Sequence, residues 1–461
     1  MVVSKFVSSG ILLFLDQIVF AGGNWLYWIV ISFLSTPSEI GQTTAVFNLI
    51  VLVAIVAQLG LEYPILKKSS TNDFRIFGTV LIIVLITTMP AIPILFFVLN
   101  NMYEGSFQNF IFIAIILLIL VQLSFVSHFV LLGLSAVKSI LIIDTISTAI
   151  KFSVGYVLTI NGYGAFGLLL SFLLQVLFIA VICFILSTRI FGFSIGKLKY
   201  VKEIVREAIS NMPSKLSWMV LLSLSPALLA MFGISTTEIG IFYMALNISF
   251  AVGSFVLSMA QMAVPHSTVS RKDLSLLSLR VGLSFASPLI GALIVSPRTI
   301  LSLIGTQYLP ADGILIVLAV SIFPFSIMIN GITKFNYSGE LTKLLLIGFI
   351  QILSFLAVFL FLTPKYGILG AAFSVLIAYS ASSVPVIIWS ERALKKYVAN
   401  FGLAILVGSL VGFLLGSLSY DGPSHIIAIF TSISIILVMN IVLKNTLPTE
   451  IKQLLKILPK R

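Results

Sequence analysis

Long apolar segments recur along this chain and leave little choice of fold. Each has roughly 17–25 residues, the length that an α-helix needs to cross a bilayer core about 30 Å thick. A segment in lipid must satisfy its backbone hydrogen bonds within itself, because lipid offers no partners. An apolar run of this length does so by forming an α-helix. Only 9% of the 461 residues are charged, whereas soluble domains carry about 25%. We therefore predict an all-α integral membrane protein.

The pattern predicts fourteen transmembrane helices. Their expected limits are 11–34, 43–66, 77–99, 109–133, 140–160, 163–187, 214–232, 240–263, 277–296, 311–333, 344–362, 367–389, 399–418 and 425–443. Positive charge tests this map, because cytoplasmic loops are enriched in Lys and Arg. With the N-terminus inside, 23 of the 27 Lys and Arg residues fall on the cytoplasmic side, and only Arg298 and Lys365 fall outside. We expect a multi-pass protein of the cell membrane with both termini in the cytoplasm.

Two pairs of matching segments indicate an internal repeat. The residues at Glu39–Gly41 recur at Glu238–Gly240, an offset of 199. The spacing Tyr-Gly-x-x-Gly at 163–167 recurs at 366–370, an offset of 203. Six spans return the chain to its starting side, so the two copies have the same orientation. This predicts two parallel six-helix halves around a central cavity, followed by two additional C-terminal helices.

The expected domain limits follow from this repeat. The N-terminal half covers 1–190, a basic cytoplasmic linker covers 191–213, and the C-terminal half covers 214–396. The last two helices and a basic cytoplasmic tail occupy 397–461. The linker region carries four basic residues, Lys197, Lys199, Lys202 and Arg206, so it is a candidate for an amphipathic helix on the membrane surface.

The whole chain resembles the multidrug/oligosaccharidyl-lipid/polysaccharide exporter superfamily. The resemblance rests on the 6+6+2 arrangement, on the Glu-Ile-Gly sequence at Glu39–Gly41, and on the stretches Gly305–Pro310 and Pro364–Ala372. The chain looks most like the polysaccharide-biosynthesis flippases of O-antigen, capsule or teichuronic type. The lipid II branch keeps arginines in its first span, and this chain has none there, which argues against lipid II as its cargo.

The resemblance implies a flippase that moves an isoprenoid-diphosphate-linked oligosaccharide from the inner to the outer leaflet by alternating access. Expected partners are this lipid-linked glycan, membrane lipids, and a glycan polymerase or glycosyltransferase. The alternative on the same fold is a cation-coupled exporter of small amphipathic drugs or metabolites. A cationic cavity would favour the first and an acidic, aromatic cavity the second; the chain offers charges of both signs.

Signals of an enzyme are absent from the sequence. There is no Walker A loop for ATP hydrolysis, and no outside loop is long enough to form a catalytic domain. The single cysteine, Cys183, and three scattered histidines have no metal-ligand spacing. We expect no catalytic residues, no cofactor and no metal. The net charge of +12 reflects topology and contact with anionic headgroups rather than nucleic-acid binding.

Ionisable residues inside membrane spans are the candidates for function, since each costs about 2.5–3.5 kcal/mol to insert. Asp144, Thr148 and Lys151 share one face of the fifth span, continued by Gly155 and Thr159. One interpretation is a substrate-facing cavity wall in which Lys151 binds the diphosphate. The other is a buried network that pairs Lys151 with Asp144.

The first and seventh spans carry a second set of candidates. Asp16 and Lys215 correspond under the repeat offset, and Asn24 lies near the same face as Asp16. Asp16 and Lys215 would form a gating ion pair at the cytoplasmic mouth, unless Lys215 simply reaches the surface. Tyr27 and Trp28, with Trp25, predict an aromatic belt at the outer membrane surface. His128 is interpreted as a helix-packing residue or, alternatively, a proton relay.

Overall fold

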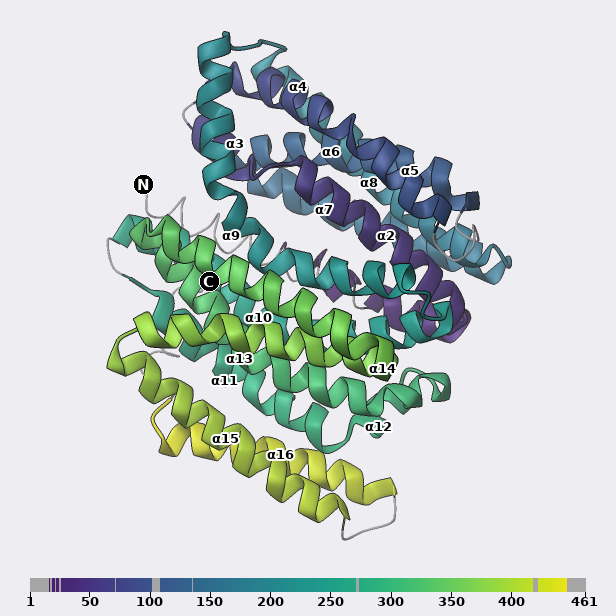
Figure 1. Cartoon of the computed structure of the whole chain (residues 1–461), viewed down its shortest axis with the longest axis vertical. Helices are drawn as coiled ribbons and strands as arrows, with labels where there is room; N and C mark the ends of the chain where they lie inside the picture. Colours follow the sequence, from purple (N-terminus) through teal and green to yellow (C-terminus); the bar gives the residue numbers. More distant parts are fainter. Residues whose placement is uncertain are drawn as a thin grey trace, which may run out of the picture. The chain divides into compact units, whose positions relative to one another are not determined.

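The computed structural model is helical throughout the part of the chain that it describes (Figure 1). It describes residues 16, 19–20, 22–24, 26–70, 72–101, 108–134, 136–270, 273–417 and 422–445. Eleven helices within these ranges are long and apolar enough to cross a membrane. The predicted all-α membrane protein is confirmed at this level.

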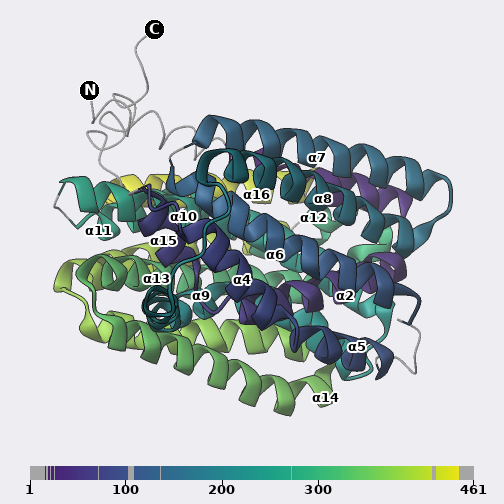
Figure 2. The same ribbon diagram turned by 90° about the horizontal axis from the view of Figure 1, so that it is seen from above.

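Two compact units divide the chain, Met1–Tyr243 and Met244–Arg461. In the first unit, residues 26–34 are helical, and the further elements are α2 (Pro37–Ala57), α3 (Glu62–Ser70), α4 (Ile76–Thr88), α5 (Ala91–Asn101), η2 (Gln108–Phe110), α6 (Ile111–Gly133), α7 (Val137–Ile160), α8 (Gly164–Phe191) and α9 (Leu198–Met231). The start of α10 (Thr236–Ser270) also belongs to it. Figure 2 shows α7 and α8 side by side, and they pack closely.

The second unit contains the rest of α10 and the elements α11 (Ser275–Val295), α12 (Pro297–Ser302), η3 (Thr306–Ala311), α13 (Asp312–Ser338), α14 (Leu341–Trp389), α15 (Arg392–Ser417) and α16 (Gly422–Val442). Arg280 of α11 is buried, donates to the Asn445 backbone oxygen at 3.0 Å, and stacks on Tyr397 of α15 at 4.4 Å. This arginine therefore links α11, α15 and the segment that follows α16.

The count of fourteen spans stays a prediction. The first expected span lies partly outside the described residues, and the seventh coincides with the end of α9, whose side chains from 213 to 223 are not described. The eleventh and twelfth run together as α14, 49 residues long. At about 1.5 Å per residue a straight helix of this length would be more than twice as long as the bilayer core is thick. The backbone leaves helical geometry at Gly367 (φ 55°, ψ −133°), which divides α14 at the expected boundary.

The matched repeat segments have the same local structure in both copies. Gly164 and Gly367, paired at the offset of 203, both have positive φ, 50° and 55°, a conformation that glycine adopts without a Cβ penalty. Ser171 and Ser374, seven residues later, are both fully buried. At the offset of 199, Glu39 and Glu238 each form a capping box, with Thr36 and Ser235. These local similarities support the proposed duplication.

The two capped helix starts also contact each other within the first unit. A Cβ atom on Gly41 would lie 2.8 Å from the Gly240 nitrogen, and one on Gly240 would lie 3.0 Å from the Gly41 nitrogen. Ser38 and Thr236 share a hydrogen bond of 2.6 Å beside this contact. Only glycine allows the two backbones to approach so closely, which explains why a residue that weakens helices stands at both positions.

Candidate functional site, a buried polar seam

The predicted polar stripe of α7 lies on one face, and that face is buried. Asp144 is 4% exposed, Thr148 is 8% exposed and Lys151 is fully buried. Gly155 and Thr159 continue the same buried face. The 3.6-residue period thus predicted the correct orientation of the helix. Because these side chains are buried, they do not contact lipid in this structure.

The described residues from 16 to 34 are helical, and this segment, called the first helix, packs along the stripe in the same direction as α7. The carboxyl group of Asp16 lies beside that of Asp144. A Cβ atom on Gly23 would lie 2.6 Å from the Thr148 methyl carbon. One turn further, Asn24 accepts a hydrogen bond from the Lys151 ammonium group. We call the residues Asp16, Asn24, Asp144, Thr148 and Lys151 the polar seam.

The acidic end of the seam brings two carboxyl groups together. Asp16 is 2% exposed, and its carboxyl group faces that of Asp144. His128 of α6 lies beside them, with 4.0 Å between its Nδ1 atom and Asp144 Oδ1. Both aspartates have one carboxyl oxygen that is buried without a hydrogen-bond partner. The groups at this end are suited to hold a proton.

The basic end of the seam is an aromatic enclosure around Lys151. The Lys151 ammonium nitrogen lies 4.6 Å from the ring centre of Tyr27 and 4.9 Å from that of Phe172 on α8. Cation–π contacts of this kind stabilise a desolvated ammonium by about 2 kcal/mol. Tyr27 is fixed in turn by a 2.8 Å hydrogen bond between its hydroxyl and that of Ser171.

The structure separates the charges that could have neutralised each other. Lys151 contacts an amide and two aromatic rings, while Asp144 contacts a second acid and a histidine. No ion pair joins Lys151 to Asp144 among the described residues. Seven helical residues, about 10 Å, lie between them. The alternative in which Asp144 simply neutralises Lys151 is therefore not supported.

Lys215, proposed to pair with Asp16, has a side chain outside the described set, so that gate stays a prediction. The aromatic-belt interpretation was wrong for two of its three residues: Tyr27 is fully buried and Trp28 is 3% exposed. Trp28 packs on Phe172 and Tyr243 at ring-centre distances of 5.9 and 5.3 Å. Trp25 lies outside the described residues.

Sequence reasoning missed Phe172 and Ser171, which complete the Lys151 enclosure from α8. Their side chains are ordinary for a membrane helix, and only the packing of three helices gives them a role. One signal was present, because Ser171 is one of the residues matched in the internal repeat. In the described part of the chain, no three His, Cys, Asp or Glu side chains gather as a metal site would require.

Comparison with known proteins gives a clear result for the fold. No protein-family model matches the sequence, and no curated protein matches it. Among solved structures, the lipid II flippase MurJ in an inward closed conformation has a TM-score of 0.71 at 15% identity, covering 96% of this chain and 99% of its own. The chain has the same fold as this flippase.

Multidrug transporters of the MATE family match the fold with lower TM-scores. An inward-facing transporter of the MATE family has a TM-score of 0.58 at 17% identity, covering 84% of this chain and 96% of its own. A second, the MATE protein in complex with MaD5, has a TM-score of 0.57 at 15% identity and covers 86% of this chain. The structural neighbours are thus transporters and flippases of a membrane, and this chain is a multi-pass membrane protein of that fold.

Proposed function

We propose that this protein is a flippase that carries an isoprenoid-diphosphate-linked oligosaccharide from the inner to the outer leaflet by alternating access. Lys151 is the observation that carries the proposal. A fully buried ammonium group at mid-membrane has no ordinary folding role, and it costs free energy that an apolar residue would not. A diphosphate that sheds water on entering the protein gains an ionic hydrogen bond from such a group.

In this structure the Lys151 ammonium group is enclosed and bonded to Asn24. Substrate entry must therefore move the first helix or α8 away from α7 to expose it. In the closed state, Asn24 accepts the hydrogen bond of the ammonium group in place of the anionic ligand. Alternating access supplies the required movement, since the same group is closed in one state and open in another.

The extent of structural similarity supports the additional helix pair. The MATE transporters cover nearly all of their own length but leave 14–16% of this chain unmatched, which is about the share of residues 397–461. The flippase of similar fold covers 96% of this chain. The specific glycan class remains our proposal from the sequence resemblance, as do partnership with glycan-assembling enzymes and location in the cell membrane with both termini cytoplasmic.

The alternative function, cation-coupled export of small amphipathic molecules, draws support from the acidic end of the seam. Asp16 and Asp144 form a buried acidic pair of the type that can exchange a proton or cation during transport. In the flippase proposal the same pair serves coupling and Lys151 serves the cargo. The two proposals differ in what a purified protein moves.

The test is transport by purified protein in liposomes. One probe is a polyisoprenyl diphosphate with a fluorescent oligosaccharide, whose movement between leaflets is followed by dithionite quenching. The other probe is ethidium, a small amphipathic cation. Movement of the glycolipid and not of ethidium is the expected result. The reverse result would overturn the proposal in favour of the alternative.

Variants of Lys151 test the residue itself. Loss of one ionic hydrogen bond of about 1.5–3 kcal/mol predicts a glycolipid rate about 10–100-fold lower in Lys151→Gln. Lys151→Arg should keep part of the activity. Lys138→Gln, an exposed lysine at the start of the same helix, is the matched control. Full activity of Lys151→Gln would remove the site assignment, and recovery on adding Asp144→Asn would show a structural charge pair instead.

A further inference from the structure

The segment between α8 and α9 has a surface that the proposed transport cycle does not use. Residues 189–209 contain five basic and two acidic residues, a net charge of +3. Only residues 192–197 separate the end of α8 from the start of α9. Because α8 is a membrane-spanning helix and α9 runs on into an apolar half, this segment is held at the membrane surface.

The first turns of α9 are fixed to the protein along one stripe. Tyr200, Ile204 and Ala208, at a spacing of four residues, are 7%, 0% and 1% exposed. They pack into a core formed with α3, α4 and α6. Figure 1 shows these turns crossing the ends of α3 and α4 instead of running parallel to α4. These first turns of α9 therefore lie across the bundle end, in the direction of the membrane plane.

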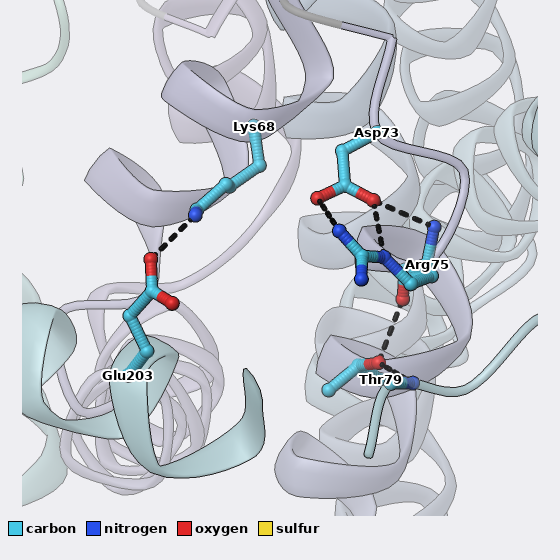
Figure 3. A network of polar contacts seen from close by, with 6 residues as sticks. Lys68, Asp73, Arg75, Thr79 and Glu203 are labelled. Atoms are coloured by element: carbon cyan, nitrogen blue, oxygen red, sulfur yellow. Dashed lines mark hydrogen bonds and ion pairs between the residues drawn. The ribbon is translucent and has the colours of Figure 1, made fainter. Parts of the chain in front are cut away.

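Polar contacts reinforce this attachment (Figure 3). Glu203 and Lys68 of α3 form an ion pair of 2.6 Å. Thr79 of α4 accepts a hydrogen bond of 2.8 Å from the Gly196 backbone nitrogen, and its own hydroxyl donates to the Arg75 carbonyl oxygen. The linker and α9 are thus positioned by both ends of the α3–α4 connection.

An uncovered stripe follows around the helix. Leu198, Lys202 and Ile209 follow each other at spacings of four and seven residues, which places them on one face. Leu198 is 69% exposed and Ile209 is 54% exposed. The apolar arc of the helix is therefore wider than the protein covers. Its uncovered edge carries an exposed lysine between two exposed aliphatic side chains.

The neighbouring residues extend the same combination. Lys199 is exposed beside this stripe, and Arg189 and Lys197 are exposed before it. Phe193 and Ile195 of the connection are 59% and 54% exposed. Exposed aromatic and aliphatic side chains next to a row of cations are the composition of helices that lie in the interface of an anionic membrane.

We propose that residues 189–209 form a binding surface for anionic phospholipid headgroups. Leu198, Ile209, Phe193 and Ile195 insert below the phosphate level, and Lys199 and Lys202 contact the phosphates. On the predicted topology this surface faces the cytoplasmic leaflet, whose anionic lipids attract basic residues at about 1 kcal/mol each. The surface is separate from the polar seam and would remain if the proposed cargo were wrong.

The first experiment measures where these side chains lie. The native Cys183 is fully buried, and a Cys183→Ala background leaves one introduced thiol for a nitroxide label. Labels at Leu198→Cys and Phe193→Cys are compared with Leu353→Cys, exposed on a membrane helix, and Lys395→Cys, exposed at the start of α15. In vesicles of phosphatidylcholine with one quarter phosphatidylglycerol, we expect strong oxygen and weak nickel-chelate collision at both test positions. Collision rates equal to those at Lys395→Cys would overturn insertion.

The second experiment measures the lipid preference. Phosphatidylglycerol binding to protein in phosphatidylcholine nanodiscs is measured for Lys199→Gln with Lys202→Gln, and for a matched pair, Lys395→Gln with Lys396→Gln. The test pair should weaken the tightest phosphatidylglycerol binding about thirty-fold, which corresponds to about 1 kcal/mol for each lysine. Equal weakening by the two pairs would show general surface charge and would overturn the site.

Discussion

The Gly41–Gly240 contact allows us to predict both the direction and the size of a change in stability. A Cβ atom on Gly41 would lie 2.7 Å from the Thr236 carbonyl carbon and still closer to its oxygen, whereas ordinary contacts begin at 3.4 Å. In Gly41→Ala the two backbones must therefore separate by at least 0.7 Å, the difference between these distances. The same movement stretches the 2.6 Å hydrogen bond between Ser38 and Thr236 to about 3.3 Å or more, outside the usual range.

Two contributions to the free energy of unfolding oppose one another, and the cost of the close contact is larger than the gain in helix propensity. Overpacking costs about 1–3 kcal/mol, and loss of the hydrogen bond adds about 1 kcal/mol. Replacing a helical glycine with alanine returns about 1 kcal/mol. We expect Gly41→Ala to lower the free energy of unfolding by about 1–3 kcal/mol. Gly240→Ala should do the same, because its Cβ atom would lie 2.7 Å from the Pro37 carbonyl carbon.

The assay is unfolding by SDS titration in mixed micelles, with Gly253→Ala as the control. A Cβ atom on Gly253 would lie 3.6 Å from Phe325, an ordinary contact, so this variant should be unchanged or up to about 1 kcal/mol more stable. The double variant of Gly41 and Gly240 should cost less than the sum of the singles, since both open one contact. Equal stability of Gly41→Ala and Gly253→Ala would refute the reasoning.

Two further predictions concern the attachment of α9. Arg75 donates two side-chain hydrogen bonds to Asp73, of 2.9 and 3.0 Å, and these lower the pKa of Asp73 below its usual value. A lowered pKa stabilises the fold above the unfolded-state pKa, about 3.9, and that contribution disappears as the pH falls through the folded pKa. Thermal unfolding midpoints should therefore fall less between about pH 5 and 3 in Asp73→Asn than in the wild type; identical pH profiles would contradict the assignment. Tyr200→Ala should cost about 3 kcal/mol as a buried aromatic, and Glu203→Gln less than about 1 kcal/mol as a half-exposed ion pair; a larger loss in Glu203→Gln would show that charge, not burial, holds the linker.

The sequence was informative where a local pattern decides the structure. Helix period placed Asp144, Thr148 and Lys151 on one buried face, and the glycine spacing placed the division of α14 at Gly367. It could not show that Lys151 contacts Asn24 and two rings while Asp144 contacts Asp16. Both arrangements have the same pattern on α7, and the choice depends on the register of another helix.

The aromatic residues of the first helix show the same limit. A Tyr and a Trp near a helix end have the composition of an interfacial belt, and composition does not record how deep a neighbouring helix packs. Three aromatic neighbours surround Tyr27 within 6.3 Å, and they come from the first helix, α7 and α8. Their convergence is a property of the folded unit.

The positive φ values of Gly164 and Gly367 also have a consequence for evolution. If one ancestral segment was copied, both copies inherited a turn in which residues other than glycine are strained. Mutation can then rewrite the flanking sequence freely, while these two positions stay fixed for the same stereochemical reason. A saturation library scored for growth should thus tolerate few substitutions at two positions, 203 residues apart. The pattern of tolerated residues should be the same at both, in a chain whose halves otherwise diverge.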